Sequence, residues 1–483
     1  MLKNNFKFND NRIKMLIYIS VYGCIAVFLY CFFSQAHPLI VFDTDDWGYI
    51  SETRSILPTF STYNPAKVFP ELLMPFCGTI AAKLVFPLTG DYIGSLTVVF
   101  AAVATLFILL YIAAFNIFIK KAFKLSYIHA AVISVIFLAF HFWIFRKAET
   151  ENLFMFRSLD LNSFVNYIIS SLLNAILVMI LLAYSMPAKK MKNRNLIFKI
   201  VFIVTVYLAI FSNLFSSVIL AVFSGSVILC LIIKLIIKKI SAKEFVKNTY
   251  LHFFIILLWS VSAYFEFFGA RSAAIRKEIS FKAIKDTLFY FYLICVEDLG
   301  FAFFFFSIFV VFIALLIFVK SKMQCDTDRR YGYILYTGII CAAVSFVYIF
   351  VLCLNTHHWY IQREDAIFPF VFYAFVIVAA SLAYICKKIN KANIMLPVLA
   401  LMIVLNCNTP GITFAETNAG YCSPQVCYEI STSIVQQVLE AEEKGLNETE
   451  VYVPYYNEDN WPLSINLSRR IGYSLYKHGV TDS

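Results

Sequence analysis

Charged residues are scarce in this sequence of 483 residues. Asp, Glu, Lys and Arg make up only 14% of the chain, whereas 61% of it is hydrophobic and 51 residues are Phe. Soluble domains carry about 25% charged and about 45–50% apolar residues. A water-soluble enzyme, a disordered scaffold and a secreted disulfide framework are therefore excluded. The composition predicts a protein that crosses a membrane many times.

The sequence also lacks the short motifs of nucleotide, zinc-protease and serine-hydrolase chemistry. It contains no P-loop, GxGxxG, GxSxG or HExxH motif and no internal repeat, which disfavours a nucleotide-dependent cytoplasmic enzyme. Its 12 cysteines include no CxxC pair, and most lie in apolar runs, where cysteine behaves as a small hydrophobe. Only Cys407, Cys422 and Cys427 lie in a polar stretch, and the sequence leaves open whether they form a disulfide.

Long apolar runs are the main feature that is present, and a run of about 20 residues suffices for a helix to cross a bilayer. We expect eleven such helices and hence an all-α polytopic membrane protein. The least marked boundary is Ser212-Asn213, because residues 197–233 otherwise form one apolar run. The expected spans are residues 13–35, 92–119, 126–145, 161–184, 197–212, 214–233, 250–268, 298–319, 333–354, 366–386 and 393–407.

The distribution of charge predicts the orientation of these helices. With the N-terminus inside, the cytoplasmic segments are residues 1–14, 120–124, 189–199, 234–247, 320–330 and 387–391. They hold 24 of the 40 Lys and Arg residues but only 4 of the 30 acidic residues, as the positive-inside rule requires. The net charge of +10 is thus an orientation signal, and we expect no nucleic-acid partner. The C-terminus and any chemistry are expected on the outer side.

The first outer loop, residues 36–91, opens with the acidic sequence Asp43-Thr44-Asp45-Asp46-Trp47. In an extended chain or a helical turn, two of these carboxylates share a side, and one of them can act as a general base. The alternative is a solvated loop start in which Asp43 or Asp45 caps a short helix. Further along, the apolar segment Leu72–Phe86 is too short to cross a bilayer and predicts an interfacial or re-entrant helix.

Basic residues on the expected outer side need an explanation of their own, because the positive-inside rule disfavours them there. They include Arg157 in the second loop, Arg271 in the third, and His357, His358 and Arg363 in the fourth. Arginine and histidine suit phosphate recognition. The alternatives are a paired, solvated surface, with Arg363 bound to Glu364 or Asp365, and an amphipathic helix that faces lipid headgroups.

Residues 408–483 form a C-terminal appendage after the membrane domain of residues 1–407. Hydrophobic residues recur every four positions from Val426 to Val438 and predict a helix that ends near Gly445. Val451-Tyr452-Val453 is strand-like, and a second helix is expected over residues 462–478, before Gly479. The sequence therefore predicts a small α/β appendage on the outer side.

With these features the chain resembles the GT-C superfamily of membrane glycosyltransferases, in particular bacterial members related to glucosyltransferases that decorate cell-surface polysaccharides. The resemblance rests on the spans, the interfacial helices, the appendage and the motif Asp45-Asp46-Trp47. In the tail, Asn460-Trp461-Pro462 is followed by Arg469, Arg470 and Leu475-Tyr476, as in that family. The resemblance implies a GT-C-like fold in the bacterial cytoplasmic membrane.

Such enzymes take sugars from polyprenyl phosphate at the outer leaflet, and they would transfer them with inversion to a cell-surface glycan or lipid-linked acceptor. The resemblance implies Asp45 or Asp46 as the base, supported by Asp43. The lipid phosphate would be bound by Arg363 with His357 or His358, and by Arg157 and Arg271. Some members use a divalent cation, Mg²⁺ or Mn²⁺, which Asp43 and Asp45 would permit.

Two other functions share parts of this pattern. A polysaccharide polymerase or ligase would use diphosphate-linked donors and release polyprenyl diphosphate. A transporter or flippase would place ionisable residues at mid-span and show a two-fold repeat of broken helices, and the sequence shows neither. The sugar, the acceptor, the linkage and the oligomeric state stay open.

Overall fold

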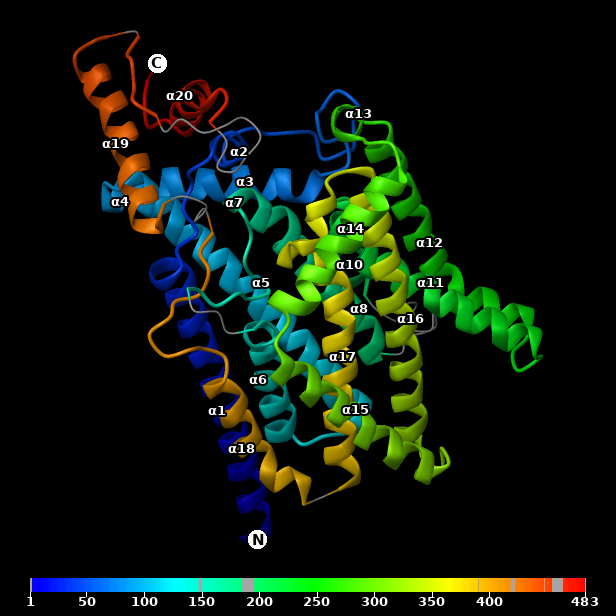
Figure 1. The fold of residues 1–483 in the computed structure, drawn as a ribbon. Coiled ribbons are helices and arrows are strands. Elements are labelled where there is room, and N and C mark those ends of the chain that lie inside the picture. The colour runs from blue at the N-terminus through cyan, green and yellow to red at the C-terminus, as the bar shows by residue number, and fades with distance from the viewer. Residues whose placement is uncertain are drawn as a thin grey trace.

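The structure is a computed structural model that describes residues 2–146, 150–184, 195–389, 391–417, 422–446, 448–453 and 464–482. Within these ranges the chain is helical, and its only β pairings are two isolated bridges, Phe145 with Leu299 and Asn152 with Phe414. The two ends of the chain lie at opposite ends of the molecule, the N-terminus at the bottom and the C-terminus at the top of Figure 1. Two segments named above lie outside the described residues: the tail motif Asn460-Trp461-Pro462 and residues 189–194 of one expected cytoplasmic segment.

Long apolar helices build the bundle. In the described part, 9 helical stretches are long and apolar enough to cross a membrane. One of them is the stretch Val68–Thr89, which comprises α3 (Val68–Ile80), a π-helical turn and α4 (Phe86–Thr89). The others are formed by α1 (Leu2–Cys31), α5 (Tyr92–Phe123), α7 (Leu161–Ser163) with α8 (Ser170–Tyr184), α11 (Leu214–Ile236), α12 (Ala242–Phe267), α15 (Phe301–Ser321), α16 (Asp326–Asn355) and α17 (Glu364–Lys388).

Three further apolar helices are shorter, namely α6 (Tyr127–Trp143), α10 (Leu196–Ile210) and α18 (Ala392–Leu405). Each of the eleven expected spans coincides with one of these helices or with one of the longer ones. The multi-pass membrane character is therefore confirmed, whereas the number of crossings stays a prediction.

Aromatic packing fills the middle of the bundle. The helices α8 and α17 are largely buried. The rings of Phe115 in α5 and Phe137 in α6 stack with their centroids 3.8 Å apart, and both side chains are fully buried. Buried aromatic side chains of this size dominate core energetics. The helices of this packed centre lead into the loops that meet at the upper end in Figure 1.

The stretch Val68–Thr89 lies across the top of the bundle in Figure 1, not along it. Its length and composition would allow a crossing, but this position favours the interfacial helix that the sequence predicts for Leu72–Phe86. One of its faces packs on α5 and α10, and Phe76 and Leu84 are exposed on the other.

The apolar run 197–233 is divided into two helices, as predicted. The chain leaves the helix after Ile210 and re-enters it at Leu214. Asn213 caps α11, because its side-chain oxygen accepts a hydrogen bond from the Phe215 N–H at 2.9 Å. On α8, Asn174 donates to the Ala209 carbonyl at 2.9 Å and so satisfies a group freed by the break.

The tail is helical in its described part. The helix α19 (Pro424–Glu443) precedes Gly445, and α20 (Leu467–His478) precedes Gly479; both glycines have left-handed φ angles, of 69° and 67°. The predicted strand at Val451–Val453 is wrong. A strand needs a partner strand, and the Tyr452 N–H donates instead to the Gln437 side chain of α19 at 3.4 Å. In the described part of the appendage, the α/β prediction is thus corrected to helices without a strand.

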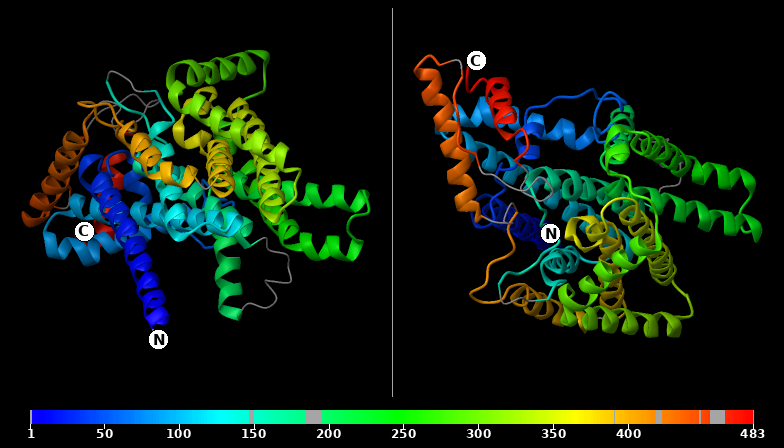
Figure 2. Two further views of the ribbon diagram at one scale, coloured as in Figure 1. Left: turned by 90° about the horizontal axis from the view of Figure 1, so that it is seen from below. Right: turned by 45° about the horizontal axis from the view of Figure 1, so that its top comes forward.

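Short helices complete the upper end. They are α2 (Thr44–Tyr49) in the first loop, α13 (Ala270–Ile275) and α14 (Phe281–Leu293) in the third loop, and a 3₁₀ helix at His358–Gln362 in the fourth. Figure 2 shows α20 beside the first loop when the top of the molecule is turned forward. Four loops and the tail therefore meet at one end.

Candidate functional site

The first-loop acids form a tight turn that begins α2. Asp43 is the N-cap residue: its Oδ1 accepts hydrogen bonds from the N–H groups of Asp45 and Asp46, each at 2.9 Å. Its Oδ2 is buried without a hydrogen-bond partner among the described residues. Burial, and then the charges of Asp46 and Asp160, raise the pKa of Asp43 well above its usual value. The capping alternative noted for Asp43 is therefore realised.

Asp46 joins the first loop to the second loop. Its side chain is fully buried, with Oδ2 accepting from the Phe42 N–H at 3.1 Å and Oδ1 from the Asn162 N–H at 2.7 Å. Burial, and then the charge of Asp160, raise the pKa of Asp46 well above its usual value. With both oxygens bound by backbone groups, Asp46 holds the site together and has no face open to a substrate.

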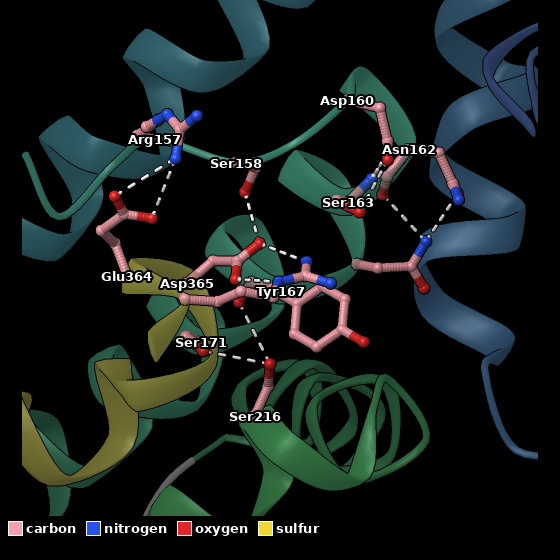
Figure 3. Close-up of polar contacts among 12 residues, drawn as sticks. Arg157, Ser158, Asp160, Asn162, Ser163, Tyr167, Ser171, Ser216, Glu364 and Asp365 are labelled. Carbon is pink, nitrogen blue, oxygen red and sulfur yellow. Dashed lines mark hydrogen bonds and ion pairs between the residues drawn. The ribbon is translucent and has the colours of Figure 1, made fainter. Parts of the chain in front are cut away.

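Asp160 adds a fourth carboxylate; with Asp43, Asp45 and Asp46 it forms the acidic cluster. It caps α7 by accepting from the N–H and the hydroxyl of Ser163, as Figure 3 shows. Burial raises the pKa of Asp160 to about 6, and the negative charge of Asp45 adds to this effect. The positive charge of Arg363 acts in the opposite direction and lowers the pKa of Asp160. Asp160 therefore lies between the first-loop acids and the fourth loop.

Asp45 is the accessible carboxylate of the acidic cluster. Its side chain is 32% exposed and forms an ion pair with Arg470 of α20, with 3.0 Å between Oδ1 and Nη1. The same Arg470 nitrogen donates to the Thr44 carbonyl at 2.8 Å. The tail thus reaches across the first loop and holds the accessible carboxylate of the acidic cluster.

A buried polar network holds the remainder of the first loop beside Asp45. Arg54 pairs with Glu71 at 2.7 Å, and Asn64 donates to Glu71 at 2.7 Å and to the Tyr49 hydroxyl at 2.7 Å. From the third loop, Arg271 donates to the Asn64 side chain at 3.3 Å. This network links Tyr49 of the first loop to Arg271 of the third loop through Asn64.

Lys67 and Arg271 are cations without a carboxylate in ion-pair contact in the described part of the chain. Lys67 is only 6% exposed and directly precedes α3. Burial, and then the positive charge of Arg271, lower the pKa of Lys67 to about 7, while the negative charges of Glu266, Glu71 and Asp45 act in the opposite direction. A buried lysine beside an arginine is suited to bind an anion.

The fourth-loop arginine Arg363 is already engaged. It forms a two-pronged pair with Asp365, at 2.9 Å and 2.8 Å, and Ser158 donates to the same carboxylate at 2.8 Å. Its guanidinium lies over the rings of Tyr167 and Tyr360, 4.7 Å and 4.9 Å from their centroids. Figure 3 shows Asp365, Ser158 and Tyr167 gathered between the second loop and α17. The ion-pair alternative for Arg363 is thus the observed one.

Arg157 lies at the outer edge of this group. Its Nη1 is 3.3 Å from Glu364, and its Nε is buried without a partner among the described residues. Arg157, Arg363, Trp359 and Gln362 help to line a cavity of about 260 Å³. The cavity brings together the second and fourth loops.

The two histidines of the fourth loop diverge. His357 packs against Tyr360, with ring centroids 5.0 Å apart and the ring planes tilted by 34°. Burial, and then the charges of Lys277 and His358, lower the pKa of His357. His358 instead turns toward the helices below, where its Nδ1 lies 3.4 Å from the Thr287 hydroxyl and 3.3 Å from the Cys353 carbonyl. Only His357 belongs with the cations of the site.

An apolar groove of about 570 Å³ runs along α3, and we call it the α3 groove. Its walls come from α3, α10 and α12, and they include Phe69, Leu73, Tyr207 and Leu258. Phe69 stands two positions after Lys67, so one end of the groove lies at the start of α3, which Lys67 precedes. An apolar chain in the groove could therefore carry an anionic group at Lys67.

The acidic residues do not fit a divalent cation held by Asp43 and Asp45. Asp43 caps backbone N–H groups and Asp45 pairs with Arg470. In the described ranges, no group of three or more His, Cys, Asp or Glu side chains could hold a metal ion.

The structure therefore brings the three first-loop acids, Arg271, Arg363, His357 and Arg157 to one end of the bundle, and it separates His358 from them. Sequence reasoning did not single out Lys67, Tyr49, Asn64 or Tyr167. The one available signal for Lys67 was a basic residue on the expected outer side. No protein-family model, curated protein or solved structure matches this chain, so its function is argued from this site.

Proposed function

We propose that this protein is an inverting membrane glycosyltransferase of GT-C type with eleven membrane-spanning helices, its N-terminus in the cytoplasm and its C-terminus outside. It transfers a sugar from a polyprenyl-phosphate donor to a cell-surface glycan or lipid-linked acceptor. The observation that supports this most is that Arg271 and the accessible carboxylate Asp45 both act electrostatically on the buried Lys67, which directly precedes the helix that lines an apolar groove.

The proposed donor matches both halves of this arrangement. Its prenyl chain would lie in the α3 groove, where each buried CH₂ group contributes about 0.8 kcal/mol. Its phosphate would lie at Lys67 and Arg271, near the N-terminal end of α3, where the helix dipole favours an anion. Arg363 and Arg157 are neutralised by their own carboxylates and contribute to the positive surroundings of the pocket.

In the reaction the acceptor hydroxyl oxygen attacks the anomeric carbon on the face opposite the phosphate. The new C–O bond forms as the bond from the anomeric carbon to the phosphate oxygen breaks, so the configuration inverts. Asp45 accepts the hydroxyl proton, and Lys67 and Arg271 stabilise the charge that builds on the leaving phosphate. Arg470 orients the Asp45 carboxylate, and no metal ion takes part in this proposal.

The test uses the purified full-length protein in nanodiscs with a panel of polyprenyl-phosphate hexoses and a cell-envelope glycan extract as acceptor. We expect release of polyprenyl monophosphate, detected by mass spectrometry. Asp45→Asn should lower the rate by a factor of about 10² to 10⁴. The control is Glu52→Gln, because Glu52 is an exposed carboxylate of the same loop. Full activity in Asp45→Asn, release of the diphosphate, or no release by the wild-type protein would overturn the proposal.

A further inference from the structure

A second pocket lies at the other end of the bundle from the acidic cluster. Its volume is about 470 Å³, and it is formed by the ends of α5, α8 and α11 with the starts of α12 and α16. In Figure 1 the start of α16 is at the bottom, whereas α2, which carries Asp45, is near the top. We call this cavity the lower pocket, and the proposed reaction makes no use of it.

The rim of the lower pocket is positively charged. Lys234 lies in the last turn of α11 and Arg329 in the first turn of α16; both side chains are exposed and neither has an ion-pair partner in the described part of the chain. A third cation, Arg330, pairs with Asp326 at 3.2 Å and donates to the Lys121 carbonyl at 3.1 Å. Asp326 is the acidic residue on the rim, so the rim keeps an excess of two positive charges.

The wall of the lower pocket between α8 and α11 is apolar. Leu181 and Leu182 of α8, together with Phe223, Val227 and Leu231 of α11, line the pocket on this side. Lys234 thus lies where the apolar helix α11 ends, and Arg329 where the apolar helix α16 begins. In a bilayer, the ends of such helices lie at the level of the lipid headgroups. Basic pockets between membrane helices at this level bind anionic headgroups.

We propose that the lower pocket binds one anionic phospholipid, with its phosphate at Lys234 and Arg329 and an acyl chain along the apolar wall of α8 and α11. The positive rim attracts the negative headgroup, and the apolar wall accepts an acyl chain. A soluble anion would leave that wall in contact with water, so an anionic lipid fits the pocket better. The inference does not depend on the glycosyltransferase proposal, because it concerns a different surface at the other end of the bundle.

Native mass spectrometry of the purified full-length protein tests this inference. The protein is titrated in detergent with phosphatidylglycerol, phosphatidylcholine or inorganic phosphate. We expect one tightly bound phosphatidylglycerol and weaker binding of phosphatidylcholine. The double variant Lys234→Gln/Arg329→Gln should weaken phosphatidylglycerol binding about 30-fold, since each cation near an anionic lipid contributes about a factor of five.

The matched control is Lys243→Gln/Lys320→Gln. It removes two exposed positive charges from the start of α12 and the last turn of α15, outside the lower pocket. Equal binding of the two phospholipids, an equal loss in the control, or inorganic phosphate competing as strongly as the lipid would overturn the inference. If the double variant is not monodisperse, the single variants carry the test, each with an expected loss of about fivefold.

Discussion

Arg470 in the tail and Asp45 in the first loop form an ion pair across 425 residues of sequence, with 3.0 Å between Nη1 and Oδ1. The tail is fixed there by further contacts: Ser474 donates to the Trp47 carbonyl at 2.5 Å, and His478 donates to the Ile50 carbonyl at 3.1 Å. The helix α20 is therefore held against α2 by these polar contacts. A change in the position of the Arg470 side chain should alter the position of the Asp45 carboxylate.

Gly48→Ala should disturb this ion pair without unfolding the protein. A Cβ atom at Gly48 would lie 2.6 Å from the Arg470 Nη1, and a flexible arginine end can move away. We expect transfer activity to fall by about 10- to 100-fold through misplacement of the carboxylate. The thermal unfolding temperature should change little, because a partly exposed ion pair is worth about 1 kcal/mol or less. The control is Gly23→Ala, where the added Cβ meets nothing within 4 Å; equal activities of the two variants would contradict the prediction.

Asp46→Ala should destabilise the protein, in contrast to Asp45→Ala. The Asp46 carboxylate accepts from two backbone N–H groups, those of Phe42 and Asn162, and its removal leaves both donors buried without a partner. Each unsatisfied buried group costs about 1–3 kcal/mol. Thermal unfolding in detergent should show a much lower midpoint for Asp46→Ala than for Asp45→Ala. Equal midpoints would show that Asp46 does not hold the two loops together.

Asp160→Asn should stabilise the protein at neutral pH and have little effect at pH 4. Burial raises the pKa of Asp160 to about 6 in the folded state, above the value of about 3.9 in an unfolded chain. A raised carboxyl pKa favours folding while the group is protonated, and this advantage is lost as the pH rises through about 6. Asparagine keeps the cap on Ser163 without the charge. The expected gain at pH 7.5 is on the order of 2 kcal/mol, measured by thermal unfolding at both pH values; a gain that is equal at both would contradict this origin.

The membrane architecture could be predicted from the sequence because it depends on local composition. Apolar runs gave a helix at every expected span, and even the weak break at Ser212-Asn213 was correct, since Asn213 is a strong capping residue. The prediction of a strand at Val451–Val453 was wrong, because strand pairing depends on a partner elsewhere in the chain.

The candidate site was predictable only in part. The first-loop acids are adjacent in the sequence, so the motif could be recognised. Which of them is structural and which is accessible could not be predicted. Burial and backbone contacts make Asp46 structural and leave Asp45 accessible, and both depend on Asn162 and Arg470 from distant segments. Lys67 was missed for the same reason, because its burial beside Arg271 depends on how the first and third loops fold together.

Asp365→Asn should destabilise the protein more than Arg363→Met. The first variant leaves the Arg363 guanidinium buried, with 4% of its side chain exposed, and without its carboxylate partner. Breaking a buried pair in this way costs about 3–5 kcal/mol, whereas an apolar replacement of the cation removes its desolvation cost as well. Thermal unfolding of the two variants compares them directly. A lower midpoint for Arg363→Met would show that the cation itself is needed for packing on Tyr167 and Tyr360.

Binding of the polyprenyl-phosphate donor should take up protons through Lys67. Because the pKa of Lys67 is lowered to about 7, about half of the amine is neutral at pH 7 and more of it at pH 8. A bound phosphodiester anion would favour the charged amine, so uptake should approach one proton per donor at pH 8 and nearly vanish at pH 6. Isothermal titration in buffers of different ionisation enthalpy measures this uptake. Lys67→Arg should bind the donor without proton uptake, since arginine stays charged at every accessible pH, and Lys67→Met should bind it weakly. If proton uptake persists in Lys67→Arg, another group takes up the proton, and Lys67 is not part of the phosphate site.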